Sequence, residues 1–287
     1  MVTVFALAAA LLYGSADFLG GAATRRAHVL SVLLVSGTAG MAVVLAAALV
    51  AGGPPQPAGV AWGICAGVAG GVGFMFFYAG LAAGPMTVVA PLSALVSTVL
   101  PVAVALAVGE RPGPGVYVGA LACVVAIVLV SSRGGPGLSR SAARGIVYGI
   151  ASGAAFGMFF LFIRNGGESG ALWPVAVARI AGTLIILMAA AGARIRPVHW
   201  RPDGGLFLAA LGAGVLDASA NVCYVLATRA GLFGLAVVMT SLFPGVTVLL
   251  ARFVLGERLG WAQRAGLALA AAGILLVTAT GAAGGSG

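Results

Sequence analysis

The strongest constraint on this chain is a series of apolar runs, each about long enough to cross a lipid bilayer. A bilayer core about 30 Å thick needs roughly 20 apolar residues in helical form, and ten such runs occur among the 287 residues. The spans are expected at residues 2–22, 29–51, 58–80, 86–108, 115–132, 144–164, 172–191, 205–227, 232–254 and 261–280. Glycine, proline and polar residues fill the breaks between them, as turns require. The sequence therefore predicts an all-α integral membrane protein with ten transmembrane helices.

Composition supports a membrane environment and argues against nucleic acid as a partner. The chain is 61% hydrophobic and only 7% charged, with a mean hydropathy of +1.15, which is far from the composition of soluble domains. The net charge of +9 comes from arginines scattered between the apolar runs, as expected at membrane flanks rather than in a basic patch. The 46 glycines suit close contacts between helices in lipid.

The cysteines and the N-terminus show no sign of special chemistry or processing. Cys65, Cys123 and Cys223 lie in apolar stretches without metal-ligand spacing, so we expect small core residues and neither a metal nor a cofactor. Met1 leads directly into apolar residues without a basic segment, and Asp17 follows where a small-residue cleavage site would stand. The first run is therefore expected to be a retained helix.

The two halves of the chain repeat each other. With a constant offset of 147 residues, Leu95 aligns with Leu242, and the triplet Gly-Glu-Arg at 109–111 aligns with the one at 256–258. This predicts two five-helix units, at residues 1–137 and 138–287. Because five spans are an odd number, the second unit must cross the membrane in the opposite sense, as in transporters with inverted repeats and a site near the midplane.

At this level of detail the chain resembles the EamA-type transporters of the drug/metabolite transporter superfamily. The resemblance spans nearly the whole chain and rests on the two five-helix halves and on short motifs: Gly-Glu-Arg at 109–111, Gly-Glu-Arg-Leu at 256–259, Ser241-Leu242-Phe243-Pro244, a glycine-rich fifth helix in each half and, more loosely, Tyr13-Gly14-Ser15-Ala16-Asp17-Phe18. It implies transport of a small solute, with amino acids and other metabolites as the known cargo of the family. The first half has Ser97 where the second has Pro244, so a helix break there is expected to differ between the halves.

Three charged residues stand out because they lie well inside the predicted spans, where a charge is costly and indicates function. They are Asp17, Arg179 and Asp217. Arg179 is about 10 Å into its span and Asp217 about 15 Å from the end of the next, counted from the same membrane face at 1.5 Å per residue. An ion pair between them would lower the cost of burying either charged side chain. Such a pair either opens when a charged solute arrives or serves as a permanent bridge between the two helices.

Two polar stripes accompany these charges. Asp217, Asn221 and Tyr224 are spaced i, i+4, i+7, which stacks them on one helix face, either lining a cavity or hydrogen bonding between helices. Tyr13 and Asp17 form a shorter stripe. Asp17 is a candidate for the cavity too, or else an ion-pair partner of nearby Arg25.

Helix breaks and repeated charges are the candidates for gating. Pro91, Pro101 and Pro244 lie inside predicted spans, where each proline removes a backbone donor and can form a hinge. Glu110 and Glu257 belong to the repeated triplets at helix ends, so we expect a structural or gating role rather than solute binding.

No motif of an enzyme, a channel or an ATP-driven pump is found. The sequence contains no HExxH, GxSxG or Walker motif and no repeated polar filter, so we expect no catalytic residues. The alternative to a carrier is a non-catalytic structural or receptor protein. An intramembrane enzyme is a weaker alternative. A carrier must then use ion coupling or exchange. Asp217 and Asp17 are the acidic residues within the spans, and a buried carboxylate can bind and release a proton during a transport cycle.

Arginine placement predicts the orientation. Eleven arginines lie on the face that holds the first, fifth, seventh and ninth connections, against three on the other face. Arginine near helix ends is retained in the cytoplasm, so both termini are expected outside, although relatives in the resembled family are thought to keep both termini inside. The membrane itself is expected to be the inner membrane of a bacterium. No feature specifies an oligomeric state.

Overall fold

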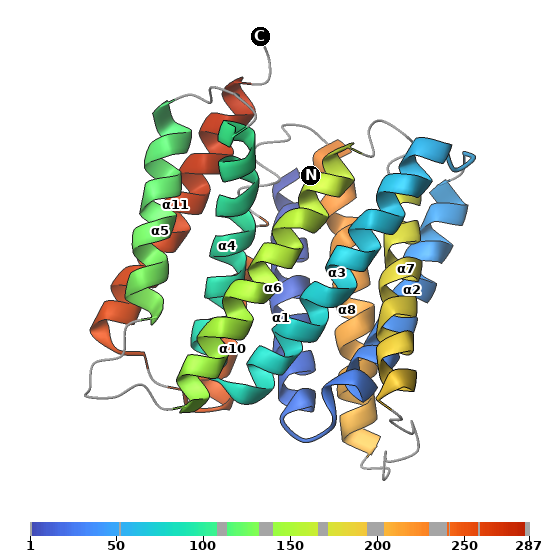
Figure 1. The fold of residues 1–287 in the computed structure, drawn as a ribbon, viewed down its shortest axis with the longest axis horizontal. Helices are drawn as coiled ribbons and strands as arrows, with labels where there is room; N and C mark the ends of the chain where they lie inside the picture. The colour runs from blue at the N-terminus through green and yellow to red at the C-terminus, as the bar shows by residue number, and fades with distance from the viewer. Residues whose placement is uncertain are drawn as a thin grey trace.

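The structure is a computed structural model that describes residues 2–51, 53–107, 114–131, 140–165, 172–193, 204–229, 240, 242–257 and 259–284. The described residues form helices and connections without a β-strand, so the all-α prediction is confirmed. The helices are α1 (Val2–Thr24), α2 (Val29–Ala51), α3 (Pro57–Ala83), α4 (Met86–Ala107), α5 (Pro114–Ser131), α6 (Arg140–Asn165), α7 (Trp173–Gly192), α8 (Gly204–Arg229), α10 (Phe243–Val254) and α11 (Trp261–Gly284). They stand side by side as one bundle (Figure 1).

Six of the described helices are long and apolar enough to cross a bilayer, namely α1, α2, α3, α6, α7 and α8. The apolar segments described in α4, α5, α10 and α11 are shorter. The expected spans therefore coincide with observed helices, except that residues 108, 132, 232–239 and 241 of these spans lie outside the described residues.

Contacts between helices fix their relative directions. Along α3 and α6, Gly70 packs on Phe159 and Gly84 packs on Gly145, so these helices are antiparallel. The ends of α1 and α3 lie together, because Tyr78 abuts Gly20. It follows that α1 and α3 run one way and α6 runs the other. Figure 1 shows α1 beginning, and α11 ending, on the same side of the bundle.

The same kind of contact orients α8. Leu19 of α1 lies near Gly212 of α8, whereas Ala6 packs with Ala227. Helix α8 is therefore antiparallel to α1, and it also runs opposite to α3. It packs along both α1 and α2, while α3 packs along α6 and α7.

Small residues allow these helices to approach closely. Gly67 of α3 lies against Ala178 of α7, and a Cβ on Gly71 would come within 2.9 Å of the Gly182 carbonyl oxygen. A larger side chain at either glycine would separate α3 from α7, as expected for membrane helix contacts lined by small residues. This contact also determines where Arg179, one residue beyond Ala178, is placed.

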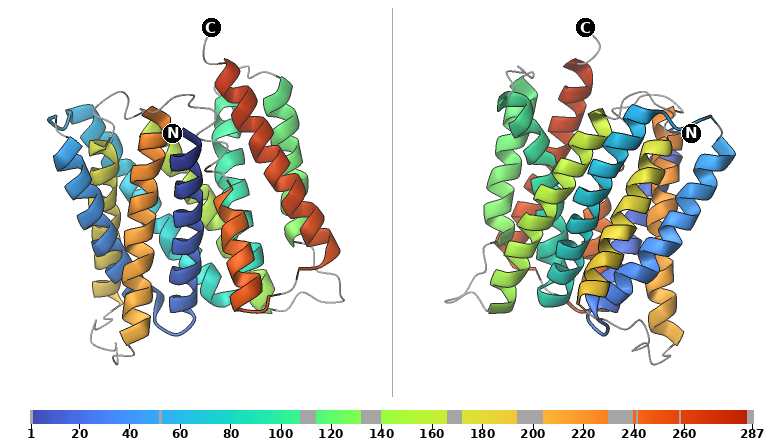
Figure 2. Two further views of the ribbon diagram at one scale, coloured as in Figure 1. Left: turned by 180° about the vertical axis from the view of Figure 1, so that it is seen from behind. Right: turned by 45° about the vertical axis from the view of Figure 1, so that its right-hand side comes forward.

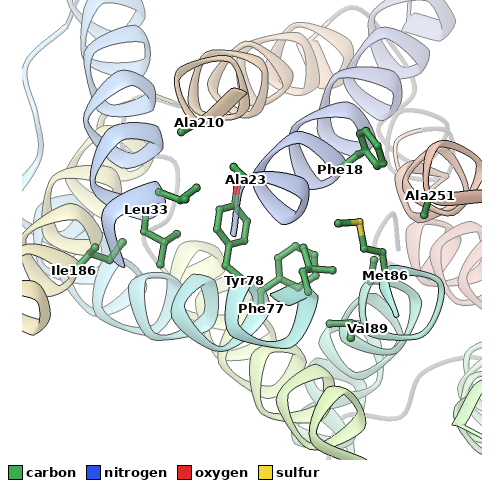
Figure 3. Close-up of a cluster of buried hydrophobic side chains, with 13 residues drawn as sticks. Phe18, Ala23, Leu33, Phe77, Tyr78, Met86, Val89, Ile186, Ala210 and Ala251 are labelled. Atoms are coloured by element: carbon green, nitrogen blue, oxygen red, sulfur yellow. The ribbon is translucent and has the colours of Figure 1, made fainter. Parts of the chain in front are cut away.

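A buried apolar cluster fills the bundle near the end where α1 stops and α4 starts. It includes Phe18, Phe77, Tyr78, Leu81 and Met86. Figure 3 shows Phe77 facing Met86, with Tyr78 extending from α3 toward α1. The cluster packs this end of the molecule across α1, α3 and α4, and also contacts α2, α7, α8 and α10.

Candidate functional site

The centre of the candidate site is an ion pair between two helices that are consecutive in the chain. The Nη2 atom of Arg179 on α7 donates to Oδ2 of Asp217 on α8. The two side chains are only 18% and 13% exposed. The Cζ atom of Arg179 also lies 5.6 Å from the ring centroid of Phe74 on α3, within the range of a cation–π contact. The site therefore joins three helices around one buried cation.

The position of Asp217 follows from close packing of α8 on α2. A Cβ on Gly40 would lie 3.1 Å from the Gly214 carbonyl oxygen, and Gly214 itself abuts the backbone of Ser36. These glycines bring α8 against α2 one turn before Asp217. Together with the glycine contact between α3 and α7, they bring four helices together at the ion pair.

Two residues of α1 extend the cluster. Asp217, Arg179, Tyr224 and Asp17 all lie close enough to the hydroxyl group of Tyr13 to interact with it electrostatically. The charge of Asp217 also acts electrostatically on Asp17. The candidate residues from α1, α7 and α8 thus form one cluster in the structure.

Asp17 differs from Asp217 in its bonding. Within the described part of the chain, no hydrogen bond or ion pair reaches the Asp17 carboxyl group. Arg25, the nearest arginine in sequence, is bound elsewhere. The expectation that Asp17 pairs with Arg25 is therefore wrong, and the physical reason is that Arg25 has a carboxylate partner from the other half of the chain.

Sequence reasoning missed three residues of the cluster. Besides Phe74, these are Tyr78, whose hydroxyl is influenced by Asp17, Asp217 and Arg179, and Ser36, whose side chain lies beside that hydroxyl. An aromatic or hydroxyl residue in an apolar helix does not stand out as a charge does. The available signal was the dense aromatic run from Phe74 to Tyr78.

Asn221 and Tyr13 make contacts that the sequence did not indicate. The amide of Asn221 donates to the carbonyl oxygen of Asp217 at 2.8 Å, within its own helix. The ring of Tyr13 lies 5.9 Å from that of Phe243 on α10. Tyr13 therefore connects the charged cluster to a helix of the second half.

The three candidate prolines differ in their helical context. Helix α4 continues through both Pro91 and Pro101, whereas Pro244 occupies the first turn of α10, where a missing N–H group costs little. Pro91 and Pro244 both line an apolar cavity of about 120 Å³ between α4, α10 and α11. The charged cluster does not line this cavity.

Glu257 organises one end of the bundle. Its carboxylate accepts hydrogen bonds from the N–H groups of Met86, at 3.2 Å, and Thr87, at 3.0 Å, at the start of α4. It also accepts a 2.6 Å bond from Nη2 of Arg25. Arg25 in turn donates to the carbonyl oxygens of Leu81 and Gly84 at the end of α3. Its repeat counterpart Glu110 lies outside the described residues.

The described residues contain no group of three or more His, Cys, Asp or Glu side chains that could hold a metal ion. The titratable side chains of the cluster are carboxylates, a guanidinium and phenols. Such groups bind charged and polar solutes and exchange protons.

Comparison with known proteins places the chain in a family. The sequence matches the EamA-like transporter family at residues 1–132 and 143–279. No curated protein matches it. A solved structure, described as a crystal structure of a protein, aligns with a TM-score of 0.64 at 21% identity over 96% of this chain and 95% of the other, which shows a shared fold. The family match covers most of both halves, so this integral membrane protein belongs to the EamA-like transporter family of the drug/metabolite transporter superfamily.

Proposed function

We propose that the protein is a secondary carrier that moves a small metabolite, amino-acid-like or another small organic solute, across a membrane by alternating access. The observation that carries the proposal is the buried pair of Arg179 and Asp217 with Asp17 beside it. Intramembrane charges mark solute and proton pathways. Membership in a transporter family supports the same conclusion.

The architecture proposed for this carrier is ten spans in two inverted five-helix repeats. In its support, α6 runs opposite to α1 and α8 runs opposite to α3. The third helix of each half also packs on the first two helices of the other half, since α3 lies on α6 and α7 while α8 lies on α1 and α2. An inverted repeat lets one half rock against the other around a central site.

In the proposed cycle, the ion pair opens to receive a charged solute. The solute replaces one partner of the pair, so that neither Arg179 nor Asp217 is left buried without a counter-charge. Tyr13, Tyr224 and Asn221 supply polar groups around it. This assigns the pair a role in binding rather than in helix attachment alone.

Asp17 is the proposed site of proton coupling. Asp217 already has a cationic partner, whereas Asp17 has no hydrogen-bond partner among the described residues. A carboxyl group without a counter-charge can bind a proton when the site is occluded and release it when water enters. Exchange of one solute for another is the alternative energy source.

Helix breaks and end charges are proposed to control access. Pro91 and Pro244 lie where α4 meets α10, and each weakens the backbone bonding of its helix. Pro101 is a further hinge in α4. Glu257 joins the α10–α11 connection to α1 and α4, and we propose that Glu110 acts at the opposite end.

A thermal-shift screen of the purified protein against classes of small metabolites tests this function. A solute that binds the folded protein must raise its unfolding temperature. We expect a charged solute to do so in the wild type and not in Arg179→Gln with Asp217→Asn. If a solute stabilises both proteins equally, the charged cluster is not part of the binding site.

A further inference from the structure

We propose that the gap between α10 and α11 is a binding site for one anionic phospholipid, with an acyl chain in the apolar cavity and the phosphate between Arg252 and Arg264. This inference depends on the chain lying in a membrane, and it does not depend on the proposed transport cycle. A transport-inactive variant that folds would keep the site.

The gap arises where the two halves pack differently. In the first half, α4 and α5 follow each other and pack side by side. In the second half, within the described residues, α10 packs along α1 and α4 while α11 packs along α5. Figure 2 shows α10 and α11 diverging toward the end where α10 stops and α11 starts.

An apolar cavity of about 120 Å³ lies in this gap. On α10 it is lined by Leu242, Pro244, Gly245 and Val248, and on α11 by Leu267, Ala270, Ala271 and Ile274. A Cβ on Gly245 would meet no atom within 4 Å, so the cavity is open beside it. A lining without charged groups suits a hydrocarbon chain.

The two arginines continue the cavity-lining stripes of their helices. On α10, Gly245, Val248 and Arg252 are spaced i, i+3, i+7, which places them on one face. On α11, Arg264 precedes Leu267 by three residues. The Cα atom of each arginine therefore lies about one turn, roughly 5 Å, beyond the cavity on its own helix.

The charge at the mouth of the gap fits an anion. Arg252 and Arg264 are both exposed, and Nε of Arg264 is held by the Leu259 carbonyl oxygen at 3.2 Å. The neighbouring carboxylate, Glu257, is already bound by Arg25 and by two backbone N–H groups. A lipid phosphate would therefore meet two arginines and a neutralised carboxylate.

Apolar side chains around the mouth indicate that this surface lies at the membrane boundary. Phe253 is 79% exposed and Trp261 is 82% exposed, and aromatic residues concentrate at the headgroup level. The same end of the molecule carries the larger number of arginines, which are attracted to anionic lipids of the cytoplasmic leaflet. A phospholipid is thus the occupant that matches both the apolar cavity and its charged edge.

Native mass spectrometry of the detergent-solubilised protein, titrated with dioleoyl phosphatidylglycerol or dioleoyl phosphatidylcholine, tests the site. We expect the first phosphatidylglycerol to bind about 30-fold more tightly than phosphatidylcholine, since each arginine near an anionic headgroup contributes about fivefold. Arg252→Gln with Arg264→Gln should abolish this preference. Gly245→Leu, whose Cβ would meet no atom within 4 Å, places an apolar side chain beside the cavity and should weaken binding of both lipids.

Two control proteins make the result specific. Arg26→Gln with Arg140→Gln removes the same charge from exposed positions at the same end of the molecule, and Gly205→Leu adds the same side chain at an open position on α8. Both should bind lipid as the wild type does. The proposal is overturned if the two arginine double variants lose binding equally, or if Gly245→Leu binds lipid normally. It is also overturned if a second copy of the chain occupies the gap. That result would be seen as a lipid-free dimer that Gly245→Leu dissociates.

Discussion

An arginine is costly inside a membrane, and the surroundings of Arg179 reduce that cost in two ways. Asp217 supplies a counter-charge, and the face of Phe74 supplies a cation–π contact. The pair is mostly buried, so removing one partner leaves the other without compensation. A pair of this kind can be structural or functional, and the two roles predict different behaviour of the double variant.

We expect Asp217→Asn to lower the free energy of unfolding by about 3 kcal/mol, because it leaves the Arg179 guanidinium buried without a carboxylate. Combining it with Arg179→Gln should restore most of that stability, since neither side chain is then charged. Thermal unfolding in detergent measures both effects. Arg140→Gln, at an exposed position, should unfold as the wild type does.

Transport by the same proteins separates the two roles. If the pair binds solute, the stable double variant remains inactive in solute uptake. If the ion pair only attaches α7 to α8, the double variant transports normally. That result would contradict a role of the pair in solute binding.

The charged residues of the site and the tyrosines on their helix faces could be predicted from the sequence, whereas the aromatic residues of α3 could not. Asp17, Arg179 and Asp217 stand out because a charge in an apolar run has few explanations. Tyr78 and Phe74 do not, since aromatic side chains are common in membrane helices. The back-bonding of Asn221 to its own helix depends on a rotamer, which spacing does not specify.

At the scale of helices, Glu257 connects elements that are far apart in the chain. It accepts two N–H bonds at the start of α4 and pairs with Arg25 at the end of α1. The unpaired N–H groups of a helix N-terminus attract a negative charge. One carboxylate thereby links the α10–α11 connection to two helices of the first half.

Glu257→Gln should destabilise the fold by about 2 kcal/mol, because hydrogen bonds to a charged acceptor are replaced by weaker neutral ones. The loss in the double variant with Arg25→Gln should be smaller than the sum of the single losses, as for any directly coupled pair. Thermal unfolding of the four proteins gives the coupling. Additive losses would mean that the two side chains do not interact.

Helix positions were largely predictable, and helix partners were not. Apolar length gave α2 at its observed bounds and most other helices within a few residues, because about 20 apolar residues must span the bilayer. The Arg25–Glu257 contact joins residues 232 positions apart. No local pattern encodes such a contact, so the sequence offered the nearer Asp17 as the partner of Arg25 instead.

At the scale of the whole molecule, arginines gather at one end of the bundle. Arg25 follows the end of α1, Arg140 begins α6 and Arg264 lies in the first turn of α11, all on the side opposite to the start of α1 (Figure 1). The positive-inside rule predicts that this end lies in the cytoplasm. On that prediction, both termini are expected outside.

Cysteine labelling of intact cells checks this orientation in a background without Cys65, Cys123 and Cys223. We expect a membrane-impermeant maleimide to modify Ser286→Cys and to spare Ser139→Cys. Permeabilised cells should label both positions, which verifies that each cysteine is reactive. Labelling of Ser139→Cys alone in intact cells would reverse the assignment.

Coupling of solute movement to proton movement is the central claim, and it is measured most directly in proteoliposomes that contain a pH-sensitive dye. With a solute identified by the thermal-shift screen, an imposed solute gradient should move protons through the wild-type protein. Asp17→Asn should reduce that proton flux to the level of protein-free vesicles, while solute-for-solute exchange continues. Proton flux in Asp17→Asn equal to that of the wild type would contradict the account.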